Sequence, residues 1–303
     1  MSKSFTLIEI LVVIVIIGIL SGFIIVSMAG VSSKARIAKS QAFTNSLRNS
    51  LLMNLIAEWN FDACAGASAT ADCIIDTWGI NGYNGGAGRV TINGTAPTVS
   101  TASSCVRNNC LNFDGSNAIT INQFTVGKNM TISLWLKSAY DDMMPFTLDS
   151  DTLWDLDIYF CGGSNLIMWD MDGDCYNDFG DSVHWPDSGW HSFVMVNNYN
   201  NGTDSSTKLY LDGTYAGTAH NYYDSTATNK HFMIGNSYSF FPWNGFIGSV
   251  DEIHVYDAAM STSQIEQNYY AGLNQLLLNG GISSGGYRKG LGELKSNLTN
   301  EKL

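Results

Sequence analysis

Residues 208–213 read KLYLDG, a short apolar run that ends in an Asp-Gly pair. Leu209, Tyr210 and Leu211 are typical of a strand, and Asp212-Gly213 tolerates the positive φ angles of a tight type I′ turn. The stretch therefore predicts a β-hairpin whose second strand starts after Gly213. Because hairpins belong to antiparallel sheets, the stretch points to a β-protein.

Similar short runs, bounded by Gly, Asn and Asp, recur on both sides of this hairpin. Strands at such regular spacing, separated by turn signals, favour a sandwich of antiparallel sheets. The predicted strands are Ala118–Ile121, Met130–Lys137, Leu156–Phe160, Leu166–Trp169, Ser192–Val196, Lys208–Leu211, Phe232–Ile234 and Val250–Tyr256.

Composition and charge narrow the class of protein. The 303 residues hold 15 Lys and Arg against 27 Asp and Glu, a formal net charge of −12. Residues 1–58 carry +3 and residues 276–303 carry +2, so residues 59–275 carry −17. Phosphate binding needs clustered Lys and Arg, so we expect no nucleic-acid partner. With 30 Gly and only 4 Pro, the chain is neither collagen-like nor a Pro-rich disordered protein.

The N-terminus contains a long apolar run. Leu7 to Val26 spans 20 residues, and at about 1.5 Å per residue this length matches a bilayer core of roughly 30 Å. The run predicts a transmembrane helix. Glu9 lies inside it, where an ionised carboxylate is costly unless a positive group pairs with it. Cleavage of the Ser4–Phe5 bond would create such a group, an α-amine on a neighbouring copy.

This four-residue leader, the Phe5 that follows it and Glu9 within an apolar helix resemble the class III signal of type IV pilins and pseudopilins. The family's leader ends in Gly, whereas this one ends in Ser4, another small residue. The resemblance implies that a prepilin peptidase cuts before Phe5 and methylates it. It also implies that Phe5 and Glu9 take part in assembly with other copies or pilin-like subunits. A plain membrane anchor is the alternative.

Beyond this run, the apolar spacing of residues 32–56 stays helical and contains no proline. One helix over residues 5–57 is therefore expected, resembling a pilin spine. By a positive-inside count, the basic residues after the apolar run would place the C-terminal side in the cytoplasm. The six cysteines, considered next, favour the opposite topology, with the C-terminal side outside the cytoplasm.

All six cysteines lie in the middle of the chain. Their separations of 9, 5 and 14 residues make three local disulfides the simplest pairing. No histidine supplies the spacing of a zinc finger. Disulfides require an oxidising compartment, so we expect an extracytoplasmic domain. The expected pairs are Cys64 with Cys73, Cys105 with Cys110, and Cys161 with Cys175.

The middle of the chain, over residues 58–270, resembles a laminin-G-like, concanavalin A-like jelly roll. Glu58–Asp62 and Asp76 look like its opening. The later landmarks follow in the family's order: Leu111–Gly115, Thr131–Trp135, Trp190-His191, Lys208–Gly213, Ile234-Gly235 and Gly245–Ile253. The resemblance implies lectin, glycosidase or adhesion functions without choosing among them. Asp155 and Tyr159 stand where glucanases of this fold carry glutamates, so we expect no enzyme.

Acidic residues suggest calcium. Asp170, Asp172, Asp174, Asp178 and Asp181 match the oxygen spacing of a calcium loop, except that Cys175 stands where Gly is expected and the last ligand is Asp rather than Glu. A solvated acidic loop is the alternative. Calcium-binding jelly rolls suggest a second site that brings together Asp62, Asp76 and Asp251.

Two tryptophans fall in predicted loops, where an aromatic face is free to stack on carbohydrate. Trp185 and Trp243 are therefore the candidate ligand contacts. From Ile265 onward the pattern becomes helical again, and we expect a helical tail over residues 271–303 with a break at Gly285-Gly286.

These observations predict a leader at 1–4, a pilin-like helix at 5–57, a jelly roll at 58–270 and a helical tail at 271–303. The expected function is a structural subunit of a type IV filament or secretion system that displays an adhesion or recognition domain. The alternative is a membrane-anchored, carbohydrate-binding surface protein that does not polymerise. Both are single-pass membrane proteins that reach the cell surface, with a carbohydrate or cell-surface ligand.

Overall fold

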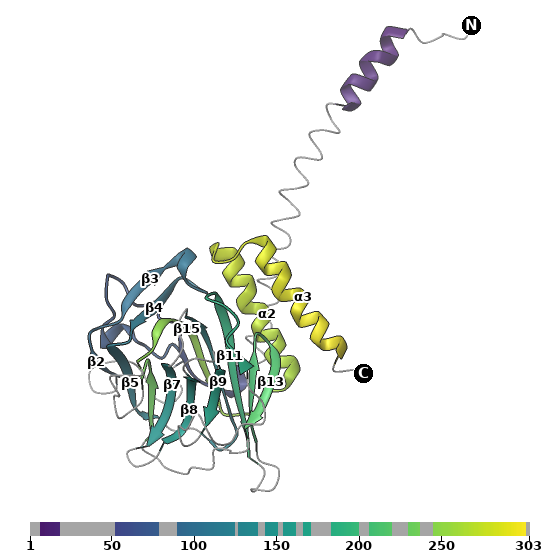
Figure 1. The fold of residues 1–303 in the computed structure, drawn as a ribbon. Helices are drawn as coiled ribbons and strands as arrows, with labels where there is room; N and C mark the ends of the chain where they lie inside the picture. Colours follow the sequence, from purple (N-terminus) through teal and green to yellow (C-terminus); the bar gives the residue numbers. More distant parts are fainter. Residues whose placement is uncertain are drawn as a thin grey trace. The chain divides into compact units, whose positions relative to one another are not determined.

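The computed structural model describes residues 7–18, 52–78, 90–124, 127–138, 143–150, 154–161, 166–170, 183–199, 206–219, 230–236 and 245–300. The chain divides into two compact units, Met1–Ser46 and Leu47–Leu303. The first contributes a helix at 7–18. The second, called the head below, contains two antiparallel sheets and two C-terminal helices (Figure 1). The predicted fold class, mainly β with helices at the ends, is confirmed.

The larger sheet of the head has the strand order β13-β12-β11-β6-β15-β4-β3, with β1 pairing to β15 from outside this path. Its strands are β1 (Leu55–Trp59), β3 (Thr98–Thr101), β4 (Asn109–Asp114), β6 (Met130–Lys137), β11 (Trp190–Asn198), β12 (Ser206–Leu211), β13 (Thr214–Ala219) and β15 (Ile247–Tyr256).

The smaller sheet has the order β10-β9-β8-β7-β14-β5-β2. Its strands are β2 (Val90–Gly94), β5 (Asn117–Phe124), β7 (Met143–Ser150), β8 (Trp154–Cys161), β9 (Leu166–Asp170), β10 (Val183–His184) and β14 (Lys230–Ile234). Each of the eight strands expected from the sequence lies within one of these elements. The expected hairpin is also confirmed, because Asp212 and Gly213 join β12 to β13 with φ angles of 51° and 76°.

Apolar side chains from both sheets fill the space between them. Trp59 of β1 and Phe232 of β14 have ring centroids 5.1 Å apart, and Phe146 of β7 lies 4.7 Å from Phe232. All three side chains are buried. Burial of apolar surface stabilises such a core by about 25 cal/mol per Å², so these rings hold the two sheets together.

The last strand of the sandwich, β15, positions the candidate site. It pairs with β6, β4 and β1, and Glu58 of β1 lies opposite His254. Its register against β6 shifts between Asp251 and His254. Glu252, inside this irregularity, has a φ of 49°, which is uncommon for a residue other than glycine. A bulge of this kind re-aims side chains, and here it brings Asp251, Glu252 and His254 toward β1 and the segment before β4.

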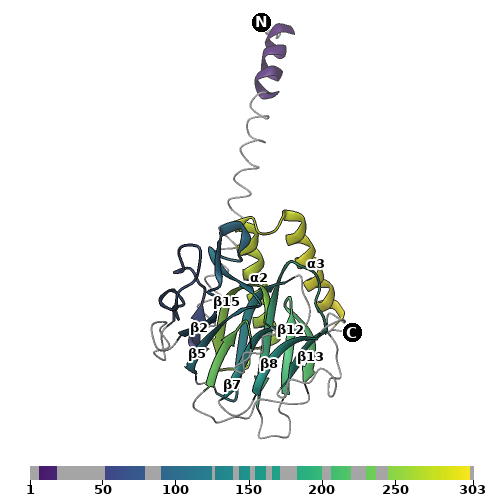
Figure 2. The ribbon, with the colours of Figure 1, turned by 60° about the vertical axis from the view of Figure 1, so that its left-hand side comes forward.

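Two helices follow the sandwich and lie side by side (Figures 1 and 2). Helix α2 is Thr262–Asn279 and helix α3 is Ser284–Asn300. The helical tail is thus present, and α2 covers the stretch from Ile265 where a helical pattern was expected to resume. One detail of the prediction is wrong. The break lies at Gly280, whose φ of 78° forms a left-handed cap, and not at Gly285-Gly286.

Helix α2 covers the outer face of the larger sheet. Tyr269 stacks on Trp135 of β6, with ring centroids 5.7 Å apart. Tyr269, Leu273 and Leu276 are buried together with Trp135. Since β6 faces the sandwich core on one side and α2 on the other, seven of its eight residues are buried.

The predicted N-terminal helix does not extend to residue 57. Leu52–Asn54 form a single 3-10 turn, and Leu55–Trp59 form β1. All five residues of β1 are buried, because the strand pairs with β15 inside the sandwich. Leu55 and Ile56 fit a helical pattern and a buried strand equally well, and the tertiary pairing selected the strand. Residues 19–51 lie outside the described ranges.

In the helix at 7–18 every residue is exposed, Glu9 included. Among the residues that the structure describes, no helix has both the length and the apolar character needed to cross a membrane. The rest of the predicted span, residues 19–26, lies outside the described ranges.

Candidate functional site

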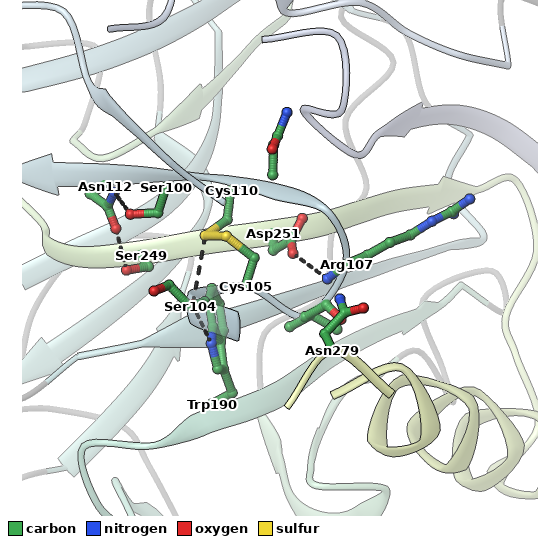
Figure 3. The surroundings of a disulfide bond; sticks show 12 residues. Ser100, Ser104, Cys105, Arg107, Cys110, Asn112, Trp190, Ser249, Asp251 and Asn279 are labelled. Atoms are coloured by element: carbon green, nitrogen blue, oxygen red, sulfur yellow. Dashed lines mark hydrogen bonds between the residues drawn. A yellow bond between two sulfur atoms is a disulfide. The ribbon is translucent and has the colours of Figure 1, made fainter. Parts of the chain in front are cut away.

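A disulfide closes a six-residue loop before β4. Cys105 is bonded to Cys110, directly after the 3-10 turn Ala102–Ser104. This segment, residues 105–110, is called the disulfide loop below. Figure 3 shows it close to β15, with the Arg107 backbone directed at the carboxylate of Asp251.

The disulfide loop donates hydrogen bonds to two carboxylates that are distant in sequence. The backbone N–H of Arg107 donates to Oδ2 of Asp251 at 2.9 Å. The side-chain amide of Asn108 donates to Oδ2 of Asp62 at 2.9 Å, and the backbone N–H of Asn109 donates to Oδ1 of Asp62 at 3.3 Å. Asp62 follows β1 and Asp251 lies in β15, so the loop ties the first strand of the head to its last.

The guanidinium of Arg107 lies between two acidic side chains. Its Nε is 3.7 Å from Oδ2 of Asp62, and its Nη1 is 3.8 Å from Oε1 of Glu252. That Oε1 atom is buried and accepts no hydrogen bond from any described residue. Because a buried charge is costly without a partner, Glu252 depends on the guanidinium beside it.

Glu58 and His254 continue this network on the side of β1. Nε2 of His254 lies 3.1 Å from Oε1 of Glu58 and 3.8 Å from Oε2 of Glu252. The hydroxyl of Thr77 donates to the other oxygen of Glu58 at 2.6 Å. The four carboxylates, called the acid cluster below, thus contact Arg107 and His254; they belong to Glu58, Asp62, Asp251 and Glu252.

Burial raises two pKa values in the acid cluster. The pKa of Asp251 is raised well above its usual range, first by its almost complete burial and then by the charge of Glu252. Burial also raises the pKa of Glu252, while His254 and Arg107 act in the opposite direction. The cluster is therefore a place where negative charge is concentrated and only partly compensated.

The disulfide loop is also held on the side of the C-terminal helices. The side-chain amide of Asn279, at the end of α2, donates to the carbonyl of Val106 at 2.9 Å. Val106 is buried against Leu273 and Leu276. The indole N–H of Trp190 donates to the carbonyl of Ser104 at 3.0 Å (Figure 3). The loop therefore connects the acid cluster with α2.

A second ionisable group lies at the start of β11. Nδ1 of His191 is 2.7 Å from Oδ2 of Asp212, and its Nε2 is 3.2 Å from Oδ1 of Asp187. Burial alone lowers the pKa of His191, but the two carboxylates, Asp212 first, outweigh burial and raise it. The charge of Lys289 in α3 also acts on Asp187.

The predicted calcium ligands have different positions. Asp62 and Asp251 belong to the acid cluster, whereas Oδ1 of Asp76 accepts the backbone N–H groups of Glu58 and Trp78, both at 3.0 Å. Within the described residues, no three His, Cys, Asp or Glu side chains are grouped as metal ligands. Asp170 ends β9. The other members of that set, Asp172, Asp174, Asp178 and Asp181, lie outside the described ranges.

Two of the three predicted disulfides are confirmed, Cys64–Cys73 and Cys105–Cys110. Cys161 ends β8, but Cys175 lies outside the described residues, as do Ser4, Phe5 and Trp243. Trp185 lies in the loop before β11 as expected. It is half-buried against the sandwich core, and its indole N–H donates to the carbonyl of Ser138 at 3.1 Å.

Sequence reasoning missed Arg107, Glu252, Glu58 and His254. Arg107 had a usable signal, because it is one of only six basic residues in the acidic stretch 59–275 and it lies between two cysteines five positions apart. Glu252 and His254 had no such signal, since alternation along a strand does not reveal a bulge.

Family models match both parts of the chain. The model described as the concanavalin A-like lectin/glucanases superfamily matches residues 113–266, which is 154 of the 303 residues. The model described as the prokaryotic N-terminal methylation motif matches residues 1–25. No curated protein sequence matches the chain.

Solved structures share the fold of the head. Domain 4 of AbnA, an extracellular arabinanase from Geobacillus stearothermophilus solved in complex with arabinotriose, is 17% identical with a TM-score of 0.50, over 70% of this chain and 97% of that one. A mutant of HCR/D is 14% identical with a TM-score of 0.50, over 74% of this chain and 54% of that one. The receptor binding domain of botulinum neurotoxin mosaic serotype C/D is 14% identical with a TM-score of 0.48, over 74% of this chain and 52% of that one.

The matched region thus spans nearly all of the arabinanase domain and about half of each of the other two structures. At these identities the likeness to the two structures with a TM-score of 0.50 concerns the fold alone. The two family models identify the two parts of the chain. The chain belongs to the concanavalin A-like lectin/glucanases superfamily and begins with the N-terminal methylation motif of type IV pilins.

Proposed function

We propose that this protein is a pilin-like or pseudopilin-like subunit of a type IV filament or secretion system, and that its head serves adhesion or recognition. A prepilin peptidase removes residues 1–4 and methylates Phe5. The apolar N-terminal helix stores the subunit in the membrane and then packs with other subunits. Glu9 pairs with the α-amine of a neighbouring subunit during assembly. The head is thereby displayed at the cell surface.

The observation that carries this proposal is the N-terminal methylation motif at residues 1–25, joined to a head with a lectin-like fold. The helix at 7–18 presents an apolar surface, with Leu7, Ile8 and Ile14 all more than half exposed. Exposed apolar surface on this scale is unfavourable in water, and a membrane or neighbouring helices would cover it. Two local disulfides in the head suit an oxidising, extracytoplasmic location.

Replacing Glu9 tests the assembly role. In cells that express Glu9→Leu, we expect filaments sheared from the surface to lack this subunit, because the helix loses the carboxylate that pairs with a neighbour's amine. The membrane fraction should still contain the folded head. Ile10→Leu is the matched control, since it changes the adjacent residue without altering charge, and it should assemble normally. Mass spectrometry of the filaments should show a subunit that starts at a methylated Phe5.

The alternative is a membrane-anchored, carbohydrate-binding protein that does not polymerise. It predicts that Glu9→Leu leaves localisation and function unchanged, and that the N-terminus stays at Met1. Either result would overturn the filament role.

For the head, we propose binding rather than catalysis, with a carbohydrate or a cell-surface molecule as ligand. The support is the fold itself, of which one example was solved with arabinotriose. Trp185 and Trp243 remain the proposed contacts, and Asp170, Asp172, Asp174, Asp178 and Asp181 remain the proposed calcium ligands. A glycan array probed with the full chain in detergent tests this role. Binding that is weakened by Trp243→Ala supports it, and silence across all glycans contradicts a lectin.

A further inference from the structure

The acid cluster poses a charge problem that a bound metal ion would commonly solve. Four carboxylates converge on one place, and Asp251 is fully buried there. Jelly rolls of this type suggest calcium at Asp62, Asp76 and Asp251. Calcium takes six to eight oxygen ligands in most protein sites, so the carboxylate oxygens would have to be turned toward the ion.

These residues do not fit such an ion. Oδ1 of Asp251 accepts the backbone N–H of Glu252 at 2.8 Å, and its Oδ2 accepts that of Arg107 at 2.9 Å. Both oxygens of Asp62 likewise accept N–H groups of the disulfide loop. Each of these four oxygens therefore already has a positively polarised hydrogen directed at it.

The guanidinium of Arg107 supplies a full positive charge at the same place. It lies within 4 Å of both Asp62 and Glu252, and a cation beside a carboxylate stabilises its charged form. A metal ion placed among these carboxylates would be repelled by this group. The same loop contributes the side-chain amide of Asn108 and the backbone N–H of Asn109, so both charge and hydrogen bonds come from one short segment.

We infer that the disulfide loop is the counter-ion of the acid cluster, and that Arg107 takes the place a divalent cation would otherwise occupy. The crosslink between Cys105 and Cys110 keeps the short segment closed, so that its N–H groups and guanidinium reach Asp62, after β1, and the carboxylates of Asp251 and Glu252 on β15. Val106 and Asn279 fasten the loop to α2 from the other side. The head therefore depends on an oxidised loop for its stability at this place, and not on calcium.

The experiment measures thermal unfolding of the full chain in detergent, with a chelator or with millimolar Ca²⁺. All variants carry Asp172→Asn and Asp174→Asn, so that calcium binding at the acidic segment 170–181 does not contribute. Arg107→Gln removes the guanidinium. Arg288→Gln is the matched control, because Arg288 is an exposed arginine of α3 whose Nε donates to the carbonyl of Ser284.

In the background that keeps Arg107, Ca²⁺ should change the melting temperature by less than about 1 °C. Arg107→Gln should lower it by about 5 °C or more in chelator, on the usual relation between lost stability and melting temperature. Ca²⁺ should then restore part of that loss, because the uncompensated carboxylates become a cation site. Arg288→Gln should show neither effect.

Two results would overturn the inference. One is a melting temperature that Ca²⁺ raises by several degrees while Arg107 is present. The other is an Arg107→Gln protein whose melting temperature equals that of its parent and does not change with Ca²⁺. Should Arg107→Gln fail to fold, the double change Cys105→Ser with Cys110→Ser, which opens the disulfide loop, takes its place. This variant is expected to melt at a lower temperature and to gain a response to Ca²⁺, and an unchanged melting temperature would again refute the inference.

Discussion

At the scale of single residues, His191 is the clearest titrating group outside the acid cluster. Both of its ring nitrogens face carboxylates, Asp212 on one side and Asp187 on the other. Only the doubly protonated imidazolium donates from both nitrogens, so the geometry favours the charged ring. The ring of Trp185 lies edge-on to it, with centroids 5.0 Å apart. Protonation therefore holds together the loop before β11 and the turn after β12.

This arrangement predicts a pH dependence with a defined sign. The pKa of His191 is raised in the folded head, so its stabilising contribution is complete below about pH 6.5, the ordinary histidine value, and is lost as pH rises through the raised value. His191→Gln should lower the free energy of unfolding by about 2 kcal/mol at low pH, which is the scale of hydrogen bonds to a charged group. Above neutrality the loss should be smaller. Urea unfolding at a series of pH values measures the difference.

A His191→Gln cost that stays constant from acid to alkaline pH would contradict the charged ring.

At the scale of elements, α2 packs against the sandwich with a close approach at Gly272. A Cβ atom at Gly272 would lie 2.2 Å from Cζ2 of Trp135, which no real contact allows. The glycine is therefore required by packing, although glycine is the weaker helix former. Residues beyond the matched family region, which ends at 266, thus became part of the head's buried structure.

Two Gly→Ala substitutions test this fit. Gly272→Ala should destabilise the protein by about 1–3 kcal/mol, because α2 must move away from Trp135. Gly292→Ala in α3 meets nothing within 4 Å, so the better helix propensity of alanine should stabilise by up to about 1 kcal/mol. Thermal unfolding of both variants checks the pair. Equal effects of the same sign would mean that α2 does not pack on Trp135.

At the scale of the whole molecule, the sign of the net charge changes along the chain. Residues 59–275 carry −17, whereas both flanking stretches are positive. Acidic bodies repel one another at low ionic strength, and salt screens the repulsion over about 10 Å at 0.1 M. In filaments of the proposed kind, lateral association should therefore increase with salt. Electron microscopy and light scattering of purified filaments measure this, and association that falls with salt would show that repulsion between heads is not what keeps filaments apart.

Much of the fold could be predicted because its signals are local. The eight expected strands and the Asp212-Gly213 turn follow from short runs of side chains and from φ preferences. The end of the N-terminal helix could not be predicted in this way. Leu55 and Ile56 have helical spacing to earlier residues, and only their pairing with β15, some two hundred positions later in the chain, made them a strand.

The candidate site was predictable only in part. Asp62 and Asp251 were expected to be ligands of an ion, and the disulfide Cys105–Cys110 was expected on its own account. The contact between this disulfide loop and the two carboxylates was not expected, because the positive group beside the carboxylates, Arg107, comes from inside the loop. A bulge at Glu252, which no alternation pattern reveals, brought the remaining acid to Arg107.

The amino-acid sequence by itself determined the class of sheet, eight of its strands, two local disulfides and the apolar N-terminus, since each depends on residues close together along the chain. Tertiary structure alone decided what neutralises the buried acids. Arg107 and Asp251 are 144 positions apart, and a contact over that separation exists only once β15 has paired with β4 in the larger sheet. The strength of the charge interaction depends on burial and distance, and the folded head sets both.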